Sequence, residues 1–380
     1  MARPPIPFNR PFVAGPETDY VAEVLAGGHL SGDGDFSRRC CQLLQETVGG
    51  ERVLLTPSCT AALELAGLLL DLGPGDEVIV PAFTFVSSVN AFVLRGATPV
   101  FVDVRPDTLN LDESLLAGRV TRRTKAVVPV HYAGVACEMD DILRVAREHD
   151  LAVVEDNAHG LFGAYRGRAL GTIGRFGTVS FHDTKNLTCG EGGALFLNEQ
   201  RDVERAEIVR EKGTNRQQFL RGDVQKYTWV DIGSSYLLSE ILAAVLYAQL
   251  GRRDFVQARR GHLWNRYFAG LRDWAAGVGA TLPTVPDHCR QTYHIFYLLL
   301  PSEALRDGLM RHLREQAVHT TFHYQPLHVS AMGLSHGGRP GDCPVAEDVS
   351  RRLLRLPLHP GLSDDDQDRV IAAVTAFAQR

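Results

Sequence analysis

The chain has 380 residues, of which 44% are hydrophobic and 22% charged, and its formal net charge is -5. This composition is that of a globular protein with a large core, and the length predicts more than one domain. A mildly acidic chain is poorly suited to non-specific binding of nucleic acid or of an anionic membrane. We therefore expect neither partner, and an anionic ligand would need a local cluster of basic groups.

The N-terminal residues 1–7 are interrupted by prolines and contain no apolar segment of the kind that a signal peptide requires. No uncharged apolar run is long enough to cross a bilayer. The seven cysteines are odd in number and lack Cys-x-x-Cys spacing, which indicates reduced thiols. These features predict a cytoplasmic protein.

Residues 1–50 are expected to form an arm and a helix, whose spacing is visible over 18–25. From about 51 to 250, short apolar runs alternate with helical segments, and most runs are apolar throughout, as in strands covered on both faces. The expected strands are 53–55, 77–81, 98–102, 126–129, 152–155, 177–181 and 194–197. The expected helices include 61–70, 86–94, 140–148 and 203–210. This alternation predicts an α/β domain with a mostly parallel sheet.

A long helix is expected over about 236–275, because strong helix formers follow one another there with few breakers. Two prolines, Pro283 and Pro286, then mark a linker. The expected elements beyond it are a strand over 293–300, a helix over 302–316, a strand over 318–324 and a helix over 364–377. We predict two domains: residues 1–250 as an arm and a large α/β domain, and 251–380 as a bridging helix and a small α+β domain.

Small residues occur where the first expected strand turns into a helix, within 54–64. The four at the helix N-terminus are Ser58, Cys59, Thr60 and Ala61. Free backbone N–H groups and the helix dipole favour an anion such as phosphate at this position. Ser58 or Thr60 could instead serve only as a helix cap. The side chain of Cys59, like that of Cys189, has the simpler interpretation of a small packing residue.

Two further positions follow strand ends, where ligands gather in such sheets. Phe85 could stack on an aromatic ligand there, or could be an ordinary core residue. Asp156 closes the apolar strand over 152–155, and a buried carboxylate without a partner is costly. The partner is either a structural salt bridge or the positively charged ring nitrogen of a ligand. His159 lies about one helical turn further on and could contact the same ring.

A lysine ends the run Ser180-Phe181-His182-Asp183-Thr184-Lys185, which precedes a glycine-rich loop. A strand ending in a carboxylate, followed by this lysine turn, is what a pyridoxal phosphate (PLP) enzyme needs. Lys185 can form a Schiff base with the PLP aldehyde, and Asp156 can keep the pyridine nitrogen protonated. Once displaced by an amino donor, the lysine amine would transfer protons as general base and acid. Ser180 can donate to the phosphate, whereas a ligand contact and simple packing are equally open for His182.

These motifs resemble those of the DegT/DnrJ/EryC1/StrS sugar aminotransferases, over nearly the whole chain. The stretches that carry the resemblance are 54–63, 92–112, 128–140, 210–216 and 226–240. The resemblance implies the aspartate aminotransferase fold (fold type I) and PLP that cycles with pyridoxamine phosphate. Within the family the chain is most similar to the dTDP-4-amino-4,6-dideoxygalactose transaminases. That similarity implies L-glutamate as donor and the C4 ketone of dTDP-4-keto-6-deoxy-D-glucose as acceptor.

The resemblance also implies roles for residues. Lys185 matches the Schiff-base lysine, Asp156 the pyridinium partner, Phe85 the stacking aromatic and His159 a residue beside the ring. The residues that match the phosphate cup are Ser58, Thr60, Ala61 and Ser180. In many relatives an Asn of the neighbouring subunit completes this cup, and Ser235 stands in its place here, which implies a homodimer with interfacial active sites. The candidate substrate contacts are Asn9, Arg10, Lys212, Arg216, Tyr324 and His328.

Several alternatives stay open. A sugar 3-dehydratase of the same family has His in place of the lysine, so Lys185 argues against that activity. An aminotransferase that acts at C3 or on another nucleotide ketosugar, a non-catalytic PLP-binding paralogue and a nucleotide-sugar binding protein are the others. The sequence leaves the gluco or galacto configuration of the product open, and both antibiotic-sugar and surface-polysaccharide biosynthesis use such a step.

Overall fold

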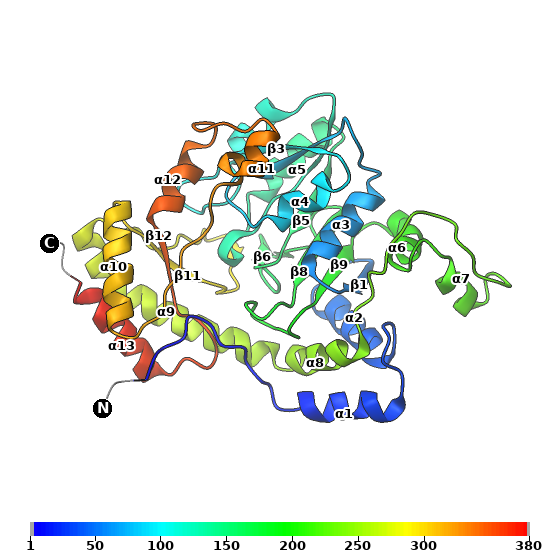
Figure 1. Cartoon of the computed structure of the whole chain (residues 1–380), viewed down its shortest axis with the longest axis horizontal. Helices are drawn as coiled ribbons and strands as arrows, with labels where there is room; N and C mark the ends of the chain where they lie inside the picture. Colours follow the sequence, from blue (N-terminus) through cyan, green and yellow to red (C-terminus); the bar gives the residue numbers. More distant parts are fainter. Residues whose placement is uncertain (1–3, 378–380) are drawn as a thin grey trace.

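The structure is a computed structural model that describes residues 4–377. Its centre is a seven-stranded sheet with the strand order β1-β9-β8-β5-β4-β2-β3 (Figure 1). These strands are β1 (Arg52–Thr56), β2 (Glu77–Pro81), β3 (Thr98–Val102), β4 (Thr124–Val127), β5 (Ala152–Asp156), β8 (Phe176–Ser180) and β9 (Gly193–Leu197). Neighbouring strands from β3 through to β8 are parallel, and only β9 runs antiparallel to its neighbours. The predicted mostly parallel sheet is confirmed.

Helices cover both faces of this sheet. One face carries α3 (Cys59–Leu69), α4 (Ser87–Val93) and α6 (Val203–Arg210). The other carries α1 (Glu17–Gly27), α2 (Asp35–Thr47), α5 (Met139–Glu148) and α8 (Glu240–Leu250). Successive side chains of a strand point to opposite faces, so Leu54 packs in the first layer while Val53 and Leu55 pack in the second. Coverage of both faces explains why these strands are apolar throughout.

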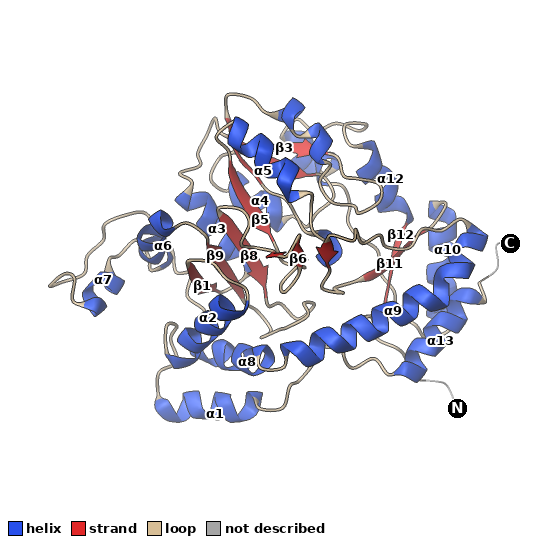
Figure 2. Cartoon of the chain, turned by 180° about the vertical axis from the view of Figure 1, so that it is seen from behind, coloured by secondary structure: helices blue, strands red, loops and turns tan. Residues whose placement is uncertain are grey.

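The C-terminal part of the chain forms a second core around the antiparallel strands β11 (Phe296–Leu299) and β12 (Leu353–Leu356). The helices that pack there are α9 (Arg253–Val278), α10 (Glu303–Glu315) and α13 (Asp364–Thr375). Ile6 of the N-terminal arm joins this core. Figure 2 shows α9 leading from α8 toward α10 and α13. The proposed division at residue 250 falls between α8 and α9.

The remaining elements are short. The helices are α7 (Arg216–Arg221), α11 (Ala331–Ser335) and α12 (Pro344–Arg352), and the strands β6 (Ala164–Tyr165), β7 (Arg168–Ala169) and β10 (Cys289–Arg290) form a small sheet. Turns of 3-10 helix lie at Glu113–Leu115, Ala117–Arg119, Tyr132–Gly134, Gln200–Asp202 and Leu327–Val329. Of the helices described, none is both long enough and apolar enough to cross a membrane.

Two expected elements differ from those observed. The helix expected over about 236–275 is divided, because α8 ends at Leu250 and α9 begins at Arg253, with Gly251 at the junction. Helix propensity extends across this region, but glycine weakens it locally and the chain must change direction to serve both cores. The strand expected over 318–324 is absent from the described structure, where that segment makes only isolated bridges to Ile6 and Arg355.

Candidate active site

The sheet brings four strand ends to one edge. Because β1 and β8 are both antiparallel to β9, they run in the same direction, and β8 shares that direction with β5 and β2. The loops that follow β1, β2, β5 and β8 therefore open at the same edge, onto a cavity of about 570 Å³. The predicted site residues that line it are Asn9, Ser58, Cys59, Thr60, Phe85, Asp156, His159, Ser180, Lys185 and Tyr324.

Asp156 ends β5 and is 5% exposed. Its Oδ2 accepts a hydrogen bond of 2.6 Å from the Ser88 hydroxyl, and its Oδ1 accepts one of 3.1 Å from the Ala158 backbone N–H. Within residues 4–377, no lysine, arginine or histidine forms an ion pair with this carboxylate. The structural salt bridge considered from the sequence is therefore absent there. A buried carboxylate that is oriented but lacks a cation suits a positively charged ring nitrogen.

The preceding residue anchors this strand end. Successive side chains of a strand leave opposite faces, so Glu155 points away from the cavity that Asp156 lines. Glu155 is fully buried and accepts from the backbone N–H groups of Gly171 at 2.9 Å and of Ile173 and Gly174 at 2.7 Å. This network fixes the backbone from which Asp156 projects.

Lys185 lies in the loop between β8 and β9. The next residue, Asn186, holds this loop through hydrogen bonds of 2.8 Å to the Thr292 carbonyl and 2.9 Å to the His294 ring. Burial lowers the pKa of Lys185; the charge of Arg355 acts in the same direction, and that of Asp156 opposes it. A lowered pKa leaves more of the amine uncharged near neutral pH, as a nucleophile requires.

The turn after β1 has the expected geometry of an anion site. Ser58 caps α3, and its Oγ accepts a 3.0 Å hydrogen bond from the Ala61 N–H. Capping uses a lone pair of Ser58 and leaves its O–H free to donate, so cap and phosphate contact are compatible. Gly193 of β9 lies so close that an added Cβ would be 2.4 Å from the Cys59 nitrogen. Ala61 itself stands behind the cavity wall and contributes through this backbone contact.

Aromatic rings form the opposite wall. His159 stacks on His294 with ring centroids 4.2 Å apart, and burial lowers the pKa of both imidazoles well below the usual range, so both are neutral. The His159 Nδ1 is buried without a hydrogen-bond partner among the described residues. Such an atom needs a partner from a ligand. Phe85 is 57% exposed and lies at the open side, 6.3 Å from the Tyr324 ring.

These groups fit PLP. The cavity offers a lysine amine, a carboxylate without a cation, a helix N-terminus, an orphaned imidazole nitrogen and an accessible aromatic face. Sequence analysis missed five residues that also line it: Phe8, Ser88, His294, His323 and Arg355. Of these, only Arg355 carried a sequence signal, as a charge inside an apolar strand.

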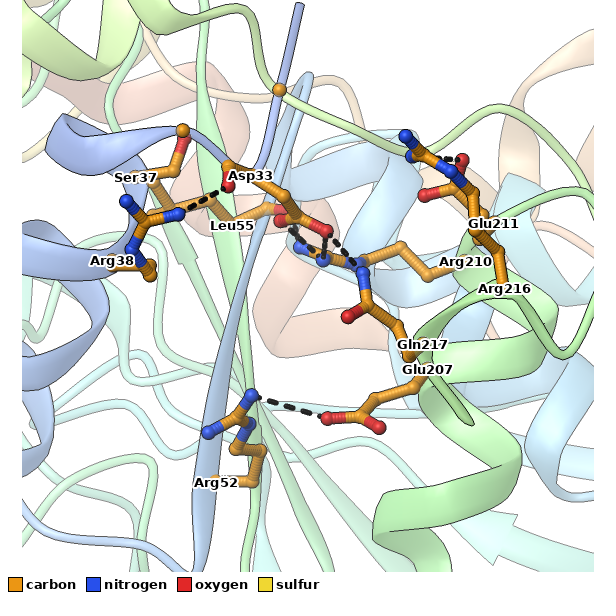
Figure 3. Close-up of polar contacts among 12 residues, drawn as sticks. Asp33, Ser37, Arg38, Arg52, Leu55, Glu207, Arg210, Glu211, Arg216 and Gln217 are labelled. Atoms are coloured by element: carbon orange, nitrogen blue, oxygen red, sulfur yellow. Dashed lines mark hydrogen bonds and ion pairs between the residues drawn. The ribbon is translucent and has the colours of Figure 1, made fainter. Parts of the chain in front are cut away.

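Five predicted residues lie outside this cavity within the chain: Arg10, Lys212, Arg216, Ser235 and His328. Lys212 and Arg216 are 3.4 Å and 3.3 Å from the buried carboxylate of Glu211, and Figure 3 shows the Arg216 contact. Ser235 pairs with Glu211 through a backbone bridge. His328 is fully buried, with its Nε2 2.9 Å from Glu347.

Comparison with known proteins agrees with this geometry. The model of the DegT/DnrJ/EryC1/StrS aminotransferase family matches residues 13–375. The spore coat polysaccharide biosynthesis protein SpsC of Bacillus subtilis is 35% identical over 377 residues, which are 97% of this chain and 96% of SpsC. The structure of S. venezuelae DesV, in complex with a ketimine intermediate, is 33% identical with a TM-score of 0.90 and covers 100% of both chains.

A third relative bears on the cofactor. Spr1654 of Streptococcus pneumoniae has been solved in a PLP form, with 27% identity, a TM-score of 0.89 and 98% coverage of both chains. Its PMP form has 27% identity and a TM-score of 0.90, and covers 97% of this chain and 98% of Spr1654. The chain described here thus belongs to the DegT/DnrJ/EryC1/StrS family and is a PLP-dependent sugar aminotransferase.

Proposed function

We propose that this aminotransferase moves an amino group from L-glutamate to the C4 ketone of dTDP-4-keto-6-deoxy-D-glucose, giving a dTDP-4-amino-4,6-dideoxyhexose. The observation that carries the proposal is the meeting of Lys185 and Asp156 in one cavity at the carboxyl edge of the sheet. The choice of C4 and of dTDP rests on the resemblance stated above. SpsC, named for polysaccharide biosynthesis, supports a role in sugar metabolism. The features of the N-terminus and the cysteines support a cytoplasmic location.

The residues divide the work. When bound, PLP supplies an electron sink that takes density from the donor carbon and carries the amino group between two half-reactions. Asp156 would hold the proton on the ring nitrogen. Lys185, with its lowered pKa, would remove and return protons at the reacting carbon. Ser58, Thr60 and Ser180 would hold the phosphate, with the N-terminus of α3 contributing backbone N–H groups.

We also propose a homodimer. Residues 216–232 project from the body of the chain with α7 (Figures 1 and 2). They carry exposed apolar side chains: Phe219, Leu220, Tyr227, Trp229, Val230 and Ile232. Apolar groups gathered on one exposed segment mark an interaction surface. A second copy of this chain is the proposed occupant, because Lys212, Arg216 and Ser235 adjoin this segment and would then serve the neighbouring active site.

Trp229→Ser is expected to weaken the dimer. Trp229 is 78% exposed, so the monomer loses little packing, whereas the dimer would lose a large buried side chain. Loss of such an anchor costs on the order of 2 kcal/mol, or roughly a 30-fold rise in the dimer dissociation constant. Sedimentation velocity over a concentration series measures it, with Leu115→Ser as an exposed apolar control. A wild-type monomer, or an unchanged constant in the variant, would contradict the proposed surface.

The substrate is tested by incubating the protein with PLP, L-glutamate and dTDP-4-keto-6-deoxy-D-glucose and recording a proton NMR spectrum of the product. A 4-amino sugar is expected. A large H3–H4 coupling assigns the gluco configuration, and a small one the galacto configuration. If L-glutamate converts the cofactor but no aminosugar forms, the proposed acceptor is wrong and other nucleotide ketosugars, including 3-keto sugars, follow. If no amino acid converts the cofactor, a non-catalytic paralogue is the answer.

A further inference from the structure

Arg355 places a positive charge in the wall of the active-site cavity. It lies on β12 opposite Tyr297, between the buried residues Leu354 and Leu356. Its side chain lines the cavity together with Lys185, and no other lysine or arginine does so. A cation in an apolar strand costs desolvation energy, so its presence here calls for a reason.

The guanidinium is held in place but not neutralised. Its Nε and Nη2 donate to the Phe322 carbonyl at 3.2 Å and 3.1 Å, and it lies 4.8 Å from the centre of the Phe8 ring. A guanidinium has five N–H donors, and these contacts occupy two of them. Among residues 4–377, no carboxylate forms an ion pair with Arg355. The terminal edge, with one N–H on each Nη, therefore keeps the fork that matches a carboxylate.

The surroundings do not supply a negative charge either. Burial lowers the pKa of His294 and His323 well below the usual range, so these neighbours are neutral. The nearby phenol groups of Tyr132 and Tyr324 stay protonated, because burial raises their pKa. Asp156 and Glu191 are the carboxylates that line the cavity, and neither pairs with Arg355. An anionic group of a substrate would complete the site.

We propose that Arg355 binds the α-carboxylate of the amino-acid donor, an assignment that rests on the proposed function. The donor nitrogen takes the place of the Lys185 amine, and its carboxylate is attached to the same carbon as that nitrogen. A carboxylate carries a single charge, which one guanidinium balances. A diphosphate carries more charge, and Lys185 and Arg355 are the only lysine and arginine in this wall. Arg355 thus selects α-amino acids as donors.

The test measures the two half-reactions separately. PLP-loaded protein is mixed with L-glutamate, and conversion is followed by loss of the cofactor's visible absorption. Arg355→Gln is expected to raise the half-saturating glutamate concentration by roughly 10- to 100-fold, as for loss of a charge-assisted hydrogen-bond pair. Arg355→Lys, which keeps the charge but not the fork, should fall between. Arg314→Gln, an exposed arginine of α10, serves as the matched control and should change nothing.

A second donor separates binding from folding. The wild type should prefer L-glutamate over its α-amide, isoglutamine, and Arg355→Gln should lose most of this preference. The sugar half-reaction, started from protein loaded with pyridoxamine phosphate, should change by less than about 3-fold, since the donor carboxylate takes no part. An unchanged donor preference overturns the proposal. So does a selective loss of the sugar half-reaction, which would assign Arg355 to the diphosphate.

Failure of the function and failure of the inference give different results. If no amino acid converts the wild-type cofactor, the proposed transamination falls and the inference with it. If L-glutamate converts both wild type and Arg355→Gln equally well, only the role of Arg355 falls. Circular dichroism and a melting curve of each variant identify a loss that comes from unfolding, and Arg355→Lys then carries the comparison.

Discussion

Lys185→Ala is expected to abolish turnover, by at least about 10⁴-fold, because it removes both the covalent attachment and the proton-transferring amine. The visible absorption of the lysine-attached cofactor should disappear as well. The fold should persist: the Lys185 side chain forms no ion pair among the described residues, and burial of its amine is unfavourable. Steady-state rates, an absorption spectrum and a thermal melt measure these effects.

Lys125→Ala is the matched control. Lys125 is an exposed lysine on β4, outside the cavity, and its replacement should leave the rate and spectrum unchanged. Added methylamine would restore part of the Lys185→Ala rate if the missing group acts as a proton carrier. Turnover above about a tenth of the wild-type value in Lys185→Ala would remove the central role proposed for this residue.

Asp156→Asn should bind the cofactor yet lose roughly 10²- to 10⁴-fold in rate, because a neutral amide cannot keep the ring nitrogen protonated. The replacement is nearly isosteric. It retains an oxygen for the 2.6 Å hydrogen bond from Ser88 and loses one acceptor site at Ala158, which costs about 1 kcal/mol of folding free energy. Rates of each half-reaction, cofactor affinity and a melting curve measure the outcome.

A cofactor analogue sharpens this test. A PLP derivative methylated at the ring nitrogen carries a permanent positive charge and should recover part of the Asp156→Asn rate, since the carboxylate is then no longer needed to hold a proton. The same analogue should give the wild type no advantage. Full activity of Asp156→Asn with ordinary PLP would show that the Asp156 charge is unnecessary and would discard its proposed role.

The sequence by itself determined the elements whose burial follows from local pattern. The strand expected over 77–81 is β2, buried along its whole length, because a continuous apolar run bounded by turns has few other stable arrangements. The same holds for Asp156, since a carboxylate after such a strand is placed at a sheet edge wherever the neighbouring strands lie. Lys185 was found through its spacing in a turn after a strand.

The tertiary structure decided which distant side chains meet. His159 and His294 lie far apart in the chain and stack only because the second core docks against the sheet. Ser88 reaches Asp156 because α4 packs beside the end of β5. Neither contact has a local period, so neither could be predicted from residue spacing.

Charge pairing was also decided by the tertiary structure. Arg216 and Arg355 are both arginines in the sequence, but one lies beside Glu211, as Figure 3 shows, and the other faces the cavity without a carboxylate. The expected single helix over 236–275 failed for a related reason, because propensity records local preference and the break at Gly251 meets the needs of two separate cores. Local pattern thus fixes which segments are buried, whereas the neighbours of a charged group depend on packing between segments that the pattern does not connect.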